Sequence, residues 1–371
     1  MDIGIPKEAR PREHRVALAP SGVRTLVQQG HRVWVESDAG LDAGHPNSAY
    51  ESAGASIAYS REEVLERAGL VATVYAPLAR DYEHLEKDQV VLGFWALPAT
   101  RPEDFKALLA RGVTAVGIEA IEDAAGRAPV RTSMSEIAGS LAVTLGSSLM
   151  LNEYGGKGIL LGGVAGVPPA HFVILGAGVL GRAAARAAIG LGAQVTLLDR
   201  SVQHLRDVGR EIRGGYTTML ATRPNIEMAL SFADLVLGAV AVSGQRAPVI
   251  VTREMLQKMK PRTVVMDLSI DMGGCFETSR PTTLASPTYE VDGILHMCVP
   301  NLPSVAARTA TKAFTNATLP YLQTIAEQGI EGALREHPDL ARGILIYRGR
   351  CANEDLARSF GVECHPVPVE G

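Results

Sequence analysis

Short apolar runs alternate with amphipathic segments along most of the chain. In the first third, five runs have the length and apolar content of buried strands. They lie at residues 2–5, 31–36, 70–75, 89–95 and 113–119. Residues 21–30 and 101–112, which lie between some of these runs, have the apolar spacing of helices. Strands that alternate with helices are typical of parallel sheets with crossover connections.

A second series of the same kind starts near residue 171. Its apolar runs lie at 171–178, 193–199, 233–240, 263–269 and 293–299. Two long helical patterns flank this series, at 133–156 and 303–329. The pattern predicts an α/β protein with two doubly wound domains and a cleft between them. We expect the first domain at residues 1–133 plus 310–371, to which the second long helix returns the chain, and the second domain at residues 134–309.

Composition narrows the class of protein. Of 371 residues, 46% are hydrophobic and 20% charged, and the net charge of −4 comes from interspersed acids and bases, so we expect no nucleic-acid partner. No apolar run reaches about 18 residues and no signal peptide precedes Met1, so we expect a cytoplasmic protein without a membrane segment. The four cysteines are far apart and form no C-x-x-C pair, which argues against a metal site.

A glycine pattern marks the candidate cofactor site. Gly176, Gly178 and Gly181 form G-x-G-x-x-G directly after an apolar strand and at the start of an alanine-rich helix. This arrangement admits a pyrophosphate at the helix N-terminus. Asp199 ends the next predicted strand, where a carboxylate accepts hydrogen bonds from ribose hydroxyls. The pattern predicts a dinucleotide site, and Asp199 favours NAD over NADP because it would repel a 2′-phosphate.

Two further residues, Asp271 and Arg15, are candidates for catalysis and for substrate binding. Asp271 follows the predicted strand "VVMDLS" and precedes paired glycines, and the ends of such strands hold the chemistry of open α/β sheets. Arg15, in "EHRVALAPSG", suits the carboxylate of a small substrate because its planar fork binds two oxygens. His296 fits a hydrogen-bonded core histidine better than a base.

Several long segments together resemble the alanine dehydrogenase family. They are "IGIPKE", "EHRVALAPSGV", "GHRVWVESDAG", "YESAGA", "MSEIAG", the glycine pattern, "DLSIDMGGCFETSRPTT" and "FTNATLPY". The resemblance covers essentially the whole chain. It implies that the first domain is a discontinuous substrate domain, completed by the C-terminal segment, and that the central domain is a Rossmann NAD domain. It also implies a homo-hexamer and hydride transfer between NAD and an amino acid, with the corresponding imino or 2-oxo acid as the other small-molecule partner.

The resemblance also implies roles for individual residues. Arg15 matches the carboxylate-binding arginine, with Asn301 at the substrate end, and Asp271 matches the aspartate that assists the amino or imino group beside the nicotinamide. The cofactor positions are Ser135, Gly176, Gly178, Val179, Leu180, Gly181, Asp199, Val240, Ala241, Leu268, Arg280, Val299, Asn301 and Leu302. At two more such positions the side chain departs from the family: His204 replaces a lysine and Ala221 a serine.

Two other departures fall on the family's catalytic pair. Tyr75 stands where the family has a substrate-binding lysine, and Ala96 where it has its catalytic histidine. Ala96 cannot transfer a proton, and losing a general acid/base costs about 10²- to 10⁴-fold in rate. A phenol can donate a hydrogen bond to a substrate carbonyl, so Tyr75 is both a substrate-binding and a catalytic candidate.

Three interpretations follow from these departures. The first, which we favour, is an NAD-dependent oxidoreductase for an amino or imino acid other than alanine. The second is a nucleotide domain like that of proton-translocating transhydrogenase, and the third is a protein that binds NAD(H) without turnover. Arg15, Asp271 and Asn301 favour the first because they stand where an amino-acid dehydrogenase needs them.

Overall fold

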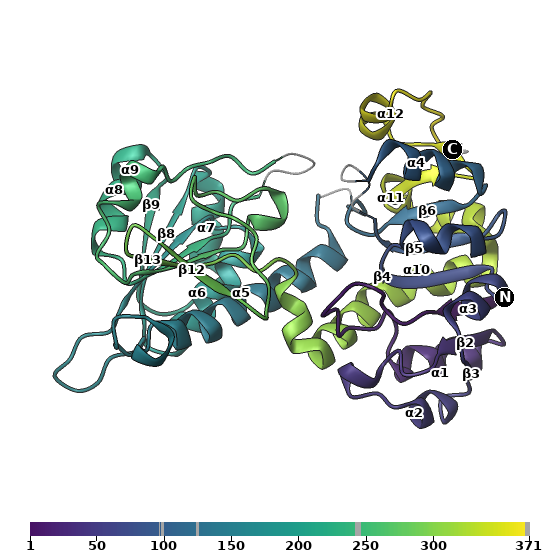
Figure 1. Cartoon of the computed structure of the whole chain (residues 1–371), viewed down its shortest axis with the longest axis horizontal. Helices are drawn as coiled ribbons and strands as arrows, with labels where there is room; N and C mark the ends of the chain where they lie inside the picture. The colour runs from purple at the N-terminus through teal and green to yellow at the C-terminus, as the bar shows by residue number, and fades with distance from the viewer. Residues whose placement is uncertain (96, 98–99, 124–125, 242–245, 368–371) are drawn as a thin grey trace. The chain divides into compact units, whose positions relative to one another are not determined.

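The computed structural model describes residues 1–95, 97, 100–123, 126–241 and 246–367. The chain divides into two compact units (Figure 1). Unit 1 comprises Met1–Met134 and Ser304–Gly371, and unit 2 comprises Ser135–Pro303. Each unit has its own sheet and its own apolar core. The prediction of two doubly wound α/β domains is confirmed.

Unit 1 is built on an eight-stranded sheet in the order β15-β14-β6-β5-β4-β1-β2-β3. Its strands are β1 (Asp2–Ile5), β2 (Arg32–Glu36), β3 (Ser56–Ala58), β4 (Leu70–Tyr75), β5 (Val90–Phe94), β6 (Thr114–Gly117), β14 (Ile344–Tyr347) and β15 (Arg350–Cys351). Strands β1 to β6 pair in parallel, and β14 and β15 are antiparallel additions. The order reverses between β1 and β4, the position where doubly wound sheets bind ligands.

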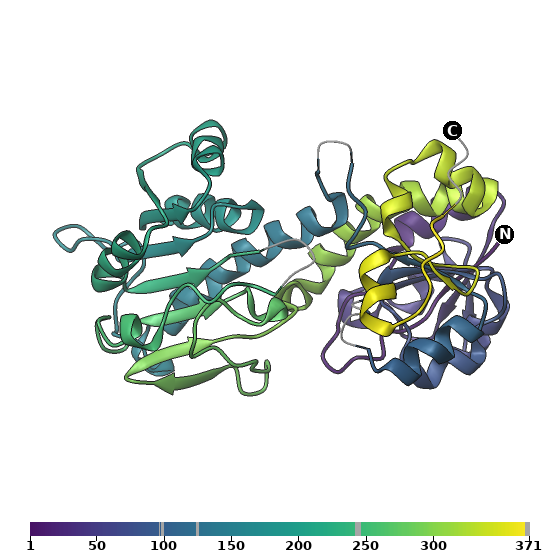
Figure 2. The same cartoon turned by 90° about the horizontal axis from the view of Figure 1, so that it is seen from above.

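The helices of unit 1 come from both ends of the chain. They are α1 (Pro20–Gln28), α2 (Asn47–Glu51), α3 (Arg61–Arg67), α4 (Pro102–Ala110), α10 (Ala307–Glu336), α11 (Leu340–Gly343) and α12 (Glu354–Phe360), with 3-10 turns η1 (Leu41–Ala43), η2 (Ala79–His84) and, at its border, η6 (Leu302–Ala306). Figure 2 shows the yellow C-terminal segment packed onto this unit. The rings of Phe105 on α4 and Phe360 on α12 stack with centroids 4.2 Å apart, so the C-terminal segment completes the core of the N-terminal one.

Unit 2 has a seven-stranded sheet in the order β12-β13-β11-β10-β7-β8-β9. Its strands are β7 (His171–Leu175), β8 (Gln194–Asp199), β9 (Tyr216–Leu220), β10 (Leu235–Gly238), β11 (Val264–Asp267), β12 (Thr288–Val291) and β13 (Ile294–Met297). Its helices are most of α5 (Pro129–Leu149), α6 (Val179–Gly190), α7 (Val202–Glu211), α8 (Arg223–Phe232) and α9 (Arg253–Leu256), with 3-10 turns η4 (Asn152–Tyr154) and η5 (Ile270–Met272). All pairs are parallel except the β12–β13 hairpin.

The two faces of this sheet bury different residues of the same strands. Phe172 and Ile174 belong to the core cluster that includes the alanines of α6, and Val173 and Leu175 belong to the cluster that includes Leu230 of α8. Side chains alternate along a strand, so a strand buried on both faces is apolar at every position. This is why β7 was visible in the sequence as an uninterrupted apolar run.

The structure corrects the bounds of the two long helices. Helix α5 (Pro129–Leu149) begins before the predicted start and ends seven residues before 156. After Leu149 the chain turns into η4, which ends at Gly155 with left-handed backbone (φ +92°). Gly156 then passes so close to the end of α5 that a side chain there would lie 2.3 Å from the carbonyl oxygen of Leu149. Helix α10 begins at Ala307, four residues after the predicted start. Its span to Glu336 consists of two helices divided by non-helical backbone at Gly329 (φ 72°), so the first of them ends at the predicted position.

Five strands were not predicted: β3, β9, β12, β14 and β15. Strand β9 lies at the edge of its sheet and is mostly exposed, so its sequence "YTTML" lacks the continuous apolar run that identified the central strands.

Candidate functional site

The three glycines after β7 have different structural roles. Gly176 has φ +112°, and a side chain there would lie 2.4 Å from the carbonyl oxygen of Ala239. A side chain on Gly181 would lie 1.9 Å from the carbonyl oxygen of Gly176, so these two glycines are required by the turn itself. Gly178 precedes α6 as its N-cap, and a side chain there would meet nothing within 4 Å. The open space at this helix N-terminus fits a pyrophosphate, which the N–H groups and the helix dipole would hold.

Asp199 ends β8 and ties this glycine turn to the next helix. Its Oδ2 accepts a hydrogen bond from the N–H of Ala177 at 2.7 Å, and its Oδ1 accepts one from the N–H of Ser201 at 2.7 Å. Nδ1 of His204, on α7, lies 3.3 Å from Oδ2. The carboxylate therefore stands at the carboxyl end of β8, beside the glycine turn, where the sequence placed the ribose acceptor.

Most other predicted cofactor positions lie at the carboxyl ends of the strands next to β7. Val240 and Ala241 follow β10, at the point where the strand order of unit 2 reverses. Leu268 follows β11, and its N–H donates to the carbonyl of Gly238 at 3.0 Å. Val299 and Leu302, both buried, follow β13. Val179 and Leu180 begin α6, Ser135 is partly buried on α5, and Arg280 is exposed with its guanidinium over the ring of Tyr289.

The loop that carries Asp271 is held by a buried carboxylate, Asp267. The Oδ2 of Asp267 accepts hydrogen bonds from the N–H of Cys275 at 2.8 Å and the hydroxyl of Ser279 at 2.6 Å. Its Oδ1 accepts one from the N–H of Ser269 at 3.0 Å. Asp271 lies in η5, inside this loop, and is exposed. The loop is thus fixed at both ends by one fully buried side chain.

In unit 1 the predicted substrate arginine forms a buried ion pair. Arg15 Nε donates to Glu13 Oε1 at 2.7 Å, and Nη2 donates to Oε2 at 2.8 Å. Both side chains are about 98% buried or more. A bidentate pair of this kind fixes the plane and direction of the guanidinium.

Tyr75 lies beside this pair at the end of β4. Its ring is 5.6 Å from the guanidinium carbon of Arg15 and 4.2 Å from that of Arg10. The carboxylate of Glu8 accepts hydrogen bonds from the N–H groups of Val74 at 2.7 Å and Tyr75 at 3.1 Å. Burial raises the pKa of Glu8 to about 7, although these hydrogen bonds act to lower it.

The predicted site residues therefore fall into two groups. Unit 1 brings together Arg15 and Tyr75, and Ala96 lies outside the described residues. Unit 2 holds Asp271, Asn301, which has φ +55°, and the cofactor positions. His296 is a fully buried, hydrogen-bonded core residue, as predicted: its Nδ1 is 3.0 Å from the carbonyl oxygen of Ile294.

Sequence reasoning did not single out Glu8, Arg10 and Asp267, and it assigned Glu13 no role. Glu13 had a usable signal, since an acid two residues before the candidate arginine is near enough in the chain to pair with it. Glu8 and Asp267 carried no signal: Glu8 accepts from backbone N–H groups distant in sequence, and Asp267 accepts from backbone N–H groups and the Ser279 hydroxyl of the loop that follows it. No group of three or more potential metal ligands occurs among the described residues, and no helix in that part of the chain is long and apolar enough to cross a bilayer.

Comparison with known proteins agrees with this geometry. Residues 4–138 match the model for "Alanine dehydrogenase/PNT, N-terminal domain", and residues 142–354 match "Alanine dehydrogenase/PNT, C-terminal domain". The chain is 42% identical to alanine dehydrogenase of Halomonas elongata over 98% of both chains. It is also 42% identical to that of Bacillus subtilis, over 99% of this chain and 97% of the other.

Two solved structures are similar in fold. One is an L-alanine dehydrogenase, with a TM-score of 0.93 and 40% identity over 97% of this chain and 99% of that one. The other is a transhydrogenase from Sinorhizobium meliloti, with a TM-score of 0.82 and 25% identity over 96% of this chain and all of that one.

The fold and the glycine turn define an NAD-dependent oxidoreductase with a Rossmann nucleotide domain. The chain belongs to the alanine dehydrogenase/PNT family.

Proposed function

We propose that the protein interconverts an amino acid with its imino or 2-oxo acid, and that this substrate is not alanine. Unit 1 is the substrate domain in this proposal, and unit 2 binds NAD. The observation that carries it is the buried Arg15, held by Glu13 and flanked by the Tyr75 ring. A buried guanidinium of fixed orientation suits recognition of a substrate carboxylate.

Each residue then has a defined task. Arg15 binds the carboxylate, and Glu13 keeps the guanidinium in the required plane. Asp271 places a negative charge beside the positive charge that develops on the amino or imino nitrogen. NAD, when bound, accepts or supplies the hydride. Asn301 is a further substrate-binding residue in this proposal. Its left-handed backbone (φ 55°) is unusual for a residue other than glycine, and such backbone is often found at functional sites.

The cofactor assignments rest on the strand ends of unit 2. The open space at Gly178 supports a pyrophosphate on α6, and Asp199 at the end of β8 supports the ribose hydroxyls. The proposed contacts also include Ser135, Gly176, Val179, Leu180, Gly181, Val240, Ala241, Leu268, Arg280, Val299, Asn301 and Leu302.

The substrate preference follows from Tyr75 and Ala96. Compared with the family, the phenol of Tyr75 replaces the lysine cation and the methyl group of Ala96 replaces the histidine imidazole. The substrate pocket would therefore be larger and less polar. The Tyr75 hydroxyl donates a hydrogen bond to the substrate carbonyl in this proposal. We therefore expect a bulkier, less polar side chain than that of alanine.

A panel assay of NADH absorbance tests the proposal. The forward direction uses NAD with L-amino acids, including alanine and bulkier or cyclic ones, and the reverse uses NADH with 2-oxo acids, with and without ammonia. We expect turnover on a member other than alanine. Preference for alanine would refute the substrate assignment and leave the class of reaction in place.

The substitution Asp271→Asn tests the mechanism separately. We expect it to abolish turnover and leave NADH affinity nearly unchanged, because the charge acts on the substrate nitrogen. Asp207→Asn on α7 is the matched control and should keep full activity. Equal turnover in Asp271→Asn would remove this carboxylate from the mechanism.

A second candidate is a nucleotide-binding protein like the transhydrogenase, which the similarity to the Sinorhizobium meliloti structure supports. Tight NADH binding without turnover on any panel member would favour it. We also propose a homo-hexamer, which sedimentation of the full-length protein tests.

A further inference from the structure

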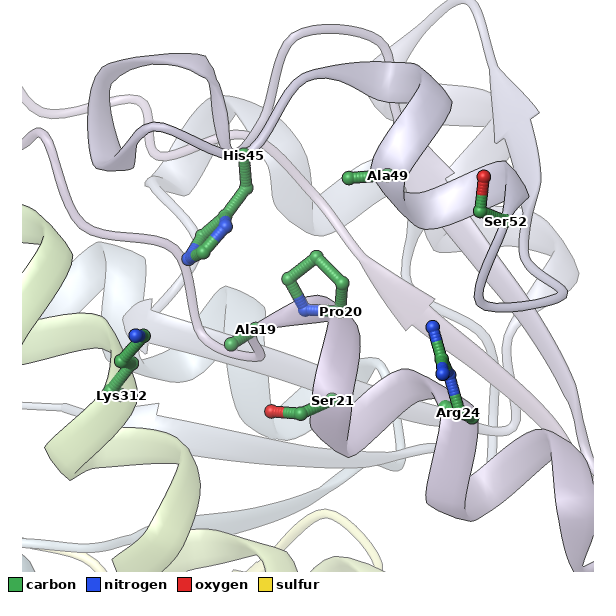
Figure 3. A pocket seen from close by; sticks show the side chains of 8 residues that line it. All are labelled: Ala19, Pro20, Ser21, Arg24, His45, Ala49, Ser52 and Lys312. Atoms are coloured by element: carbon green, nitrogen blue, oxygen red, sulfur yellow. The ribbon is translucent and has the colours of Figure 1, made fainter.

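A pocket of about 400 Å³ lies in unit 1, between the start of α1, the segment that leads into α2, and α10 (Figure 3). No residue proposed above for substrate or NAD lines it. Its walls combine apolar side chains such as Ala19 with the hydroxyl of Ser21 and the charged groups of Arg24 and Lys312. A volume of this size is in the range of small-ligand sites.

The two charged side chains in the pocket lining, Arg24 and Lys312, are both basic. Arg308 and Lys312 are four residues apart on α10 and thus lie on one face of the helix. The Arg308 side chain packs over Gly44, next to the pocket residue His45. In the part of the chain that the structure describes, Arg24, Arg308 and Lys312 form no ion pair with a carboxylate. Two basic side chains in the lining and a third beside it, Arg308, therefore stand without an ion-pair partner among the described residues.

The start of α1 adds further positive potential. Ala19 is the N-cap, it makes no side-chain capping hydrogen bond, and the first turn contains no acidic residue. The first N–H groups of a helix have no acceptor within the helix, and the helix dipole is positive at this end. The N–H of Ala19 itself is occupied, since it donates to the hydroxyl of Thr315 at 2.8 Å. Pro20 has no N–H, and the N–H groups of Gly22 and Val23 donate to the carbonyl of Ala19 at 2.9 and 3.2 Å. In this first turn the N–H of Ser21 is therefore the backbone donor that remains for a ligand.

His45 provides an independent indication of a ligand. Its side chain is in the pocket lining, the residue is only 9% exposed, and its Nε2 has no hydrogen-bond partner among the described residues. Figure 3 shows the imidazole extending toward the side of the pocket where Ala19 and Lys312 lie. A buried polar atom without a partner costs free energy, and most such atoms in proteins are bonded to something.

We propose that this pocket binds a phosphate group, carried either by inorganic phosphate or by a small phosphate monoester. Donors reach it from α1, from α10 and from the His45 segment, so they surround a tetrahedral dianion better than they match a planar carboxylate. Three cations also exceed what a single carboxylate needs. The remaining volume has room for a small organic group beside the phosphate.

Calorimetric titration of the full-length protein tests this proposal, with inorganic phosphate and glycerol 3-phosphate as the two probes. Lys312→Gln and Arg24→Gln should each weaken binding about tenfold, since each removes a charge-assisted hydrogen bond. Both side chains are exposed, so the variants should fold, which thermal unfolding verifies. Lys106→Gln on α4 is the matched control and should bind as the wild type does.

The two probes distinguish the source of the phosphate. Tighter binding of glycerol 3-phosphate would identify a monoester site, and equal or tighter binding of inorganic phosphate would identify a site for the free ion. Absence of binding, or equal binding by Lys312→Gln, Arg24→Gln and Lys106→Gln, would overturn the proposal. If neither probe binds and Lys312→Gln lowers the oligomeric state in sedimentation, the pocket receives an acidic segment of a second copy, and the proposal is wrong.

Discussion

Glu13 and Arg15, two residues apart, form a bidentate ion pair with both side chains at most 2% exposed. The pair stands beside Tyr75, whose ring is 5.6 Å from the Arg15 guanidinium carbon. Burying two charges is costly, and the Coulomb attraction offsets that cost only when the geometry is good. A buried pair at this position is therefore better explained by orientation of the guanidinium than by stability.

Glu13→Gln should destabilise the protein by about 3 kcal/mol, because it leaves the Arg15 charge buried without its counter-charge. Chemical denaturation measures this change. Turnover in the variant should require higher substrate concentration, since Arg15 loses its fixed plane. Glu103→Gln removes an exposed partner of Arg101 and should change neither quantity. A Glu13→Gln protein as stable as the wild type would mean that Arg15 does not depend on this carboxylate.

Gly178→Ala should separate cofactor binding from folding. A side chain at Gly178 meets no protein atom within 4 Å, so the thermal unfolding temperature should stay unchanged. The added methyl group would occupy the space proposed for the pyrophosphate, and NADH affinity, measured by fluorescence titration, should fall at least tenfold.

Gly190→Ala, on the same helix, is the control for this prediction. A side chain there also meets nothing within 4 Å, and the position is remote from the helix N-terminus. NADH affinity should stay as in the wild type, with stability equal or higher by about 0.5–1 kcal/mol. If Gly178→Ala binds NADH as Gly190→Ala does, the pyrophosphate does not lie at Gly178.

Asp267→Asn should loosen the loop that carries Asp271. The carboxylate of Asp267 accepts hydrogen bonds from Ser269, Cys275 and Ser279. The amide of asparagine has one acceptor oxygen, and its NH2 group would face at least one of these donors. We expect a loss of about 2 kcal/mol or more in the free energy of unfolding. The rate of turnover should fall with NADH affinity less affected. Retention of both stability and turnover would show that Asp267 does not position this loop.

Glu8 should make stability depend on pH near neutrality. Burial raises its pKa from 4.5 to about 7, so the stability that its protonated form contributes is fully present below pH 4.5. That contribution is lost as the pH rises through 7. The wild type should therefore lose stability relative to Glu8→Gln between about pH 4.5 and 7.

Parallel denaturation series of the wild type and Glu8→Gln measure this difference. Glu63→Gln, in which the changed side chain pairs with Arg67 on the surface, should follow the wild type across the range. A difference between wild type and Glu8→Gln that does not change with pH would show that Glu8 titrates normally.

The fold was largely predictable from the sequence because parallel sheets bury both faces of their central strands. Strands β1, β4, β5, β7, β10 and β11 consequently appear as continuous apolar runs. Edge strands such as β9 lack that signal, since one or both of their faces meet solvent. Helix ends were less predictable, because the turn that follows α5 returns Gly156 to the end of the helix, and the apolar spacing of the sequence does not show where such a turn begins.

The features of the candidate site were likewise predictable only in part. The sequence by itself determined the glycine turn, Asp199 at a strand end, and Arg15 and Asp271 as candidates, since each depends on spacing within one local segment. The two-residue spacing of Glu13 and Arg15 is also local, although their burial is not visible in it. Only the tertiary structure decided that Glu8 holds the end of β4 and that Asp267 ties down the Asp271 loop. It also brought α1, His45 and α10 around one pocket. These relationships join groups through burial and hydrogen bonds between separate segments, and a linear pattern does not encode such distances.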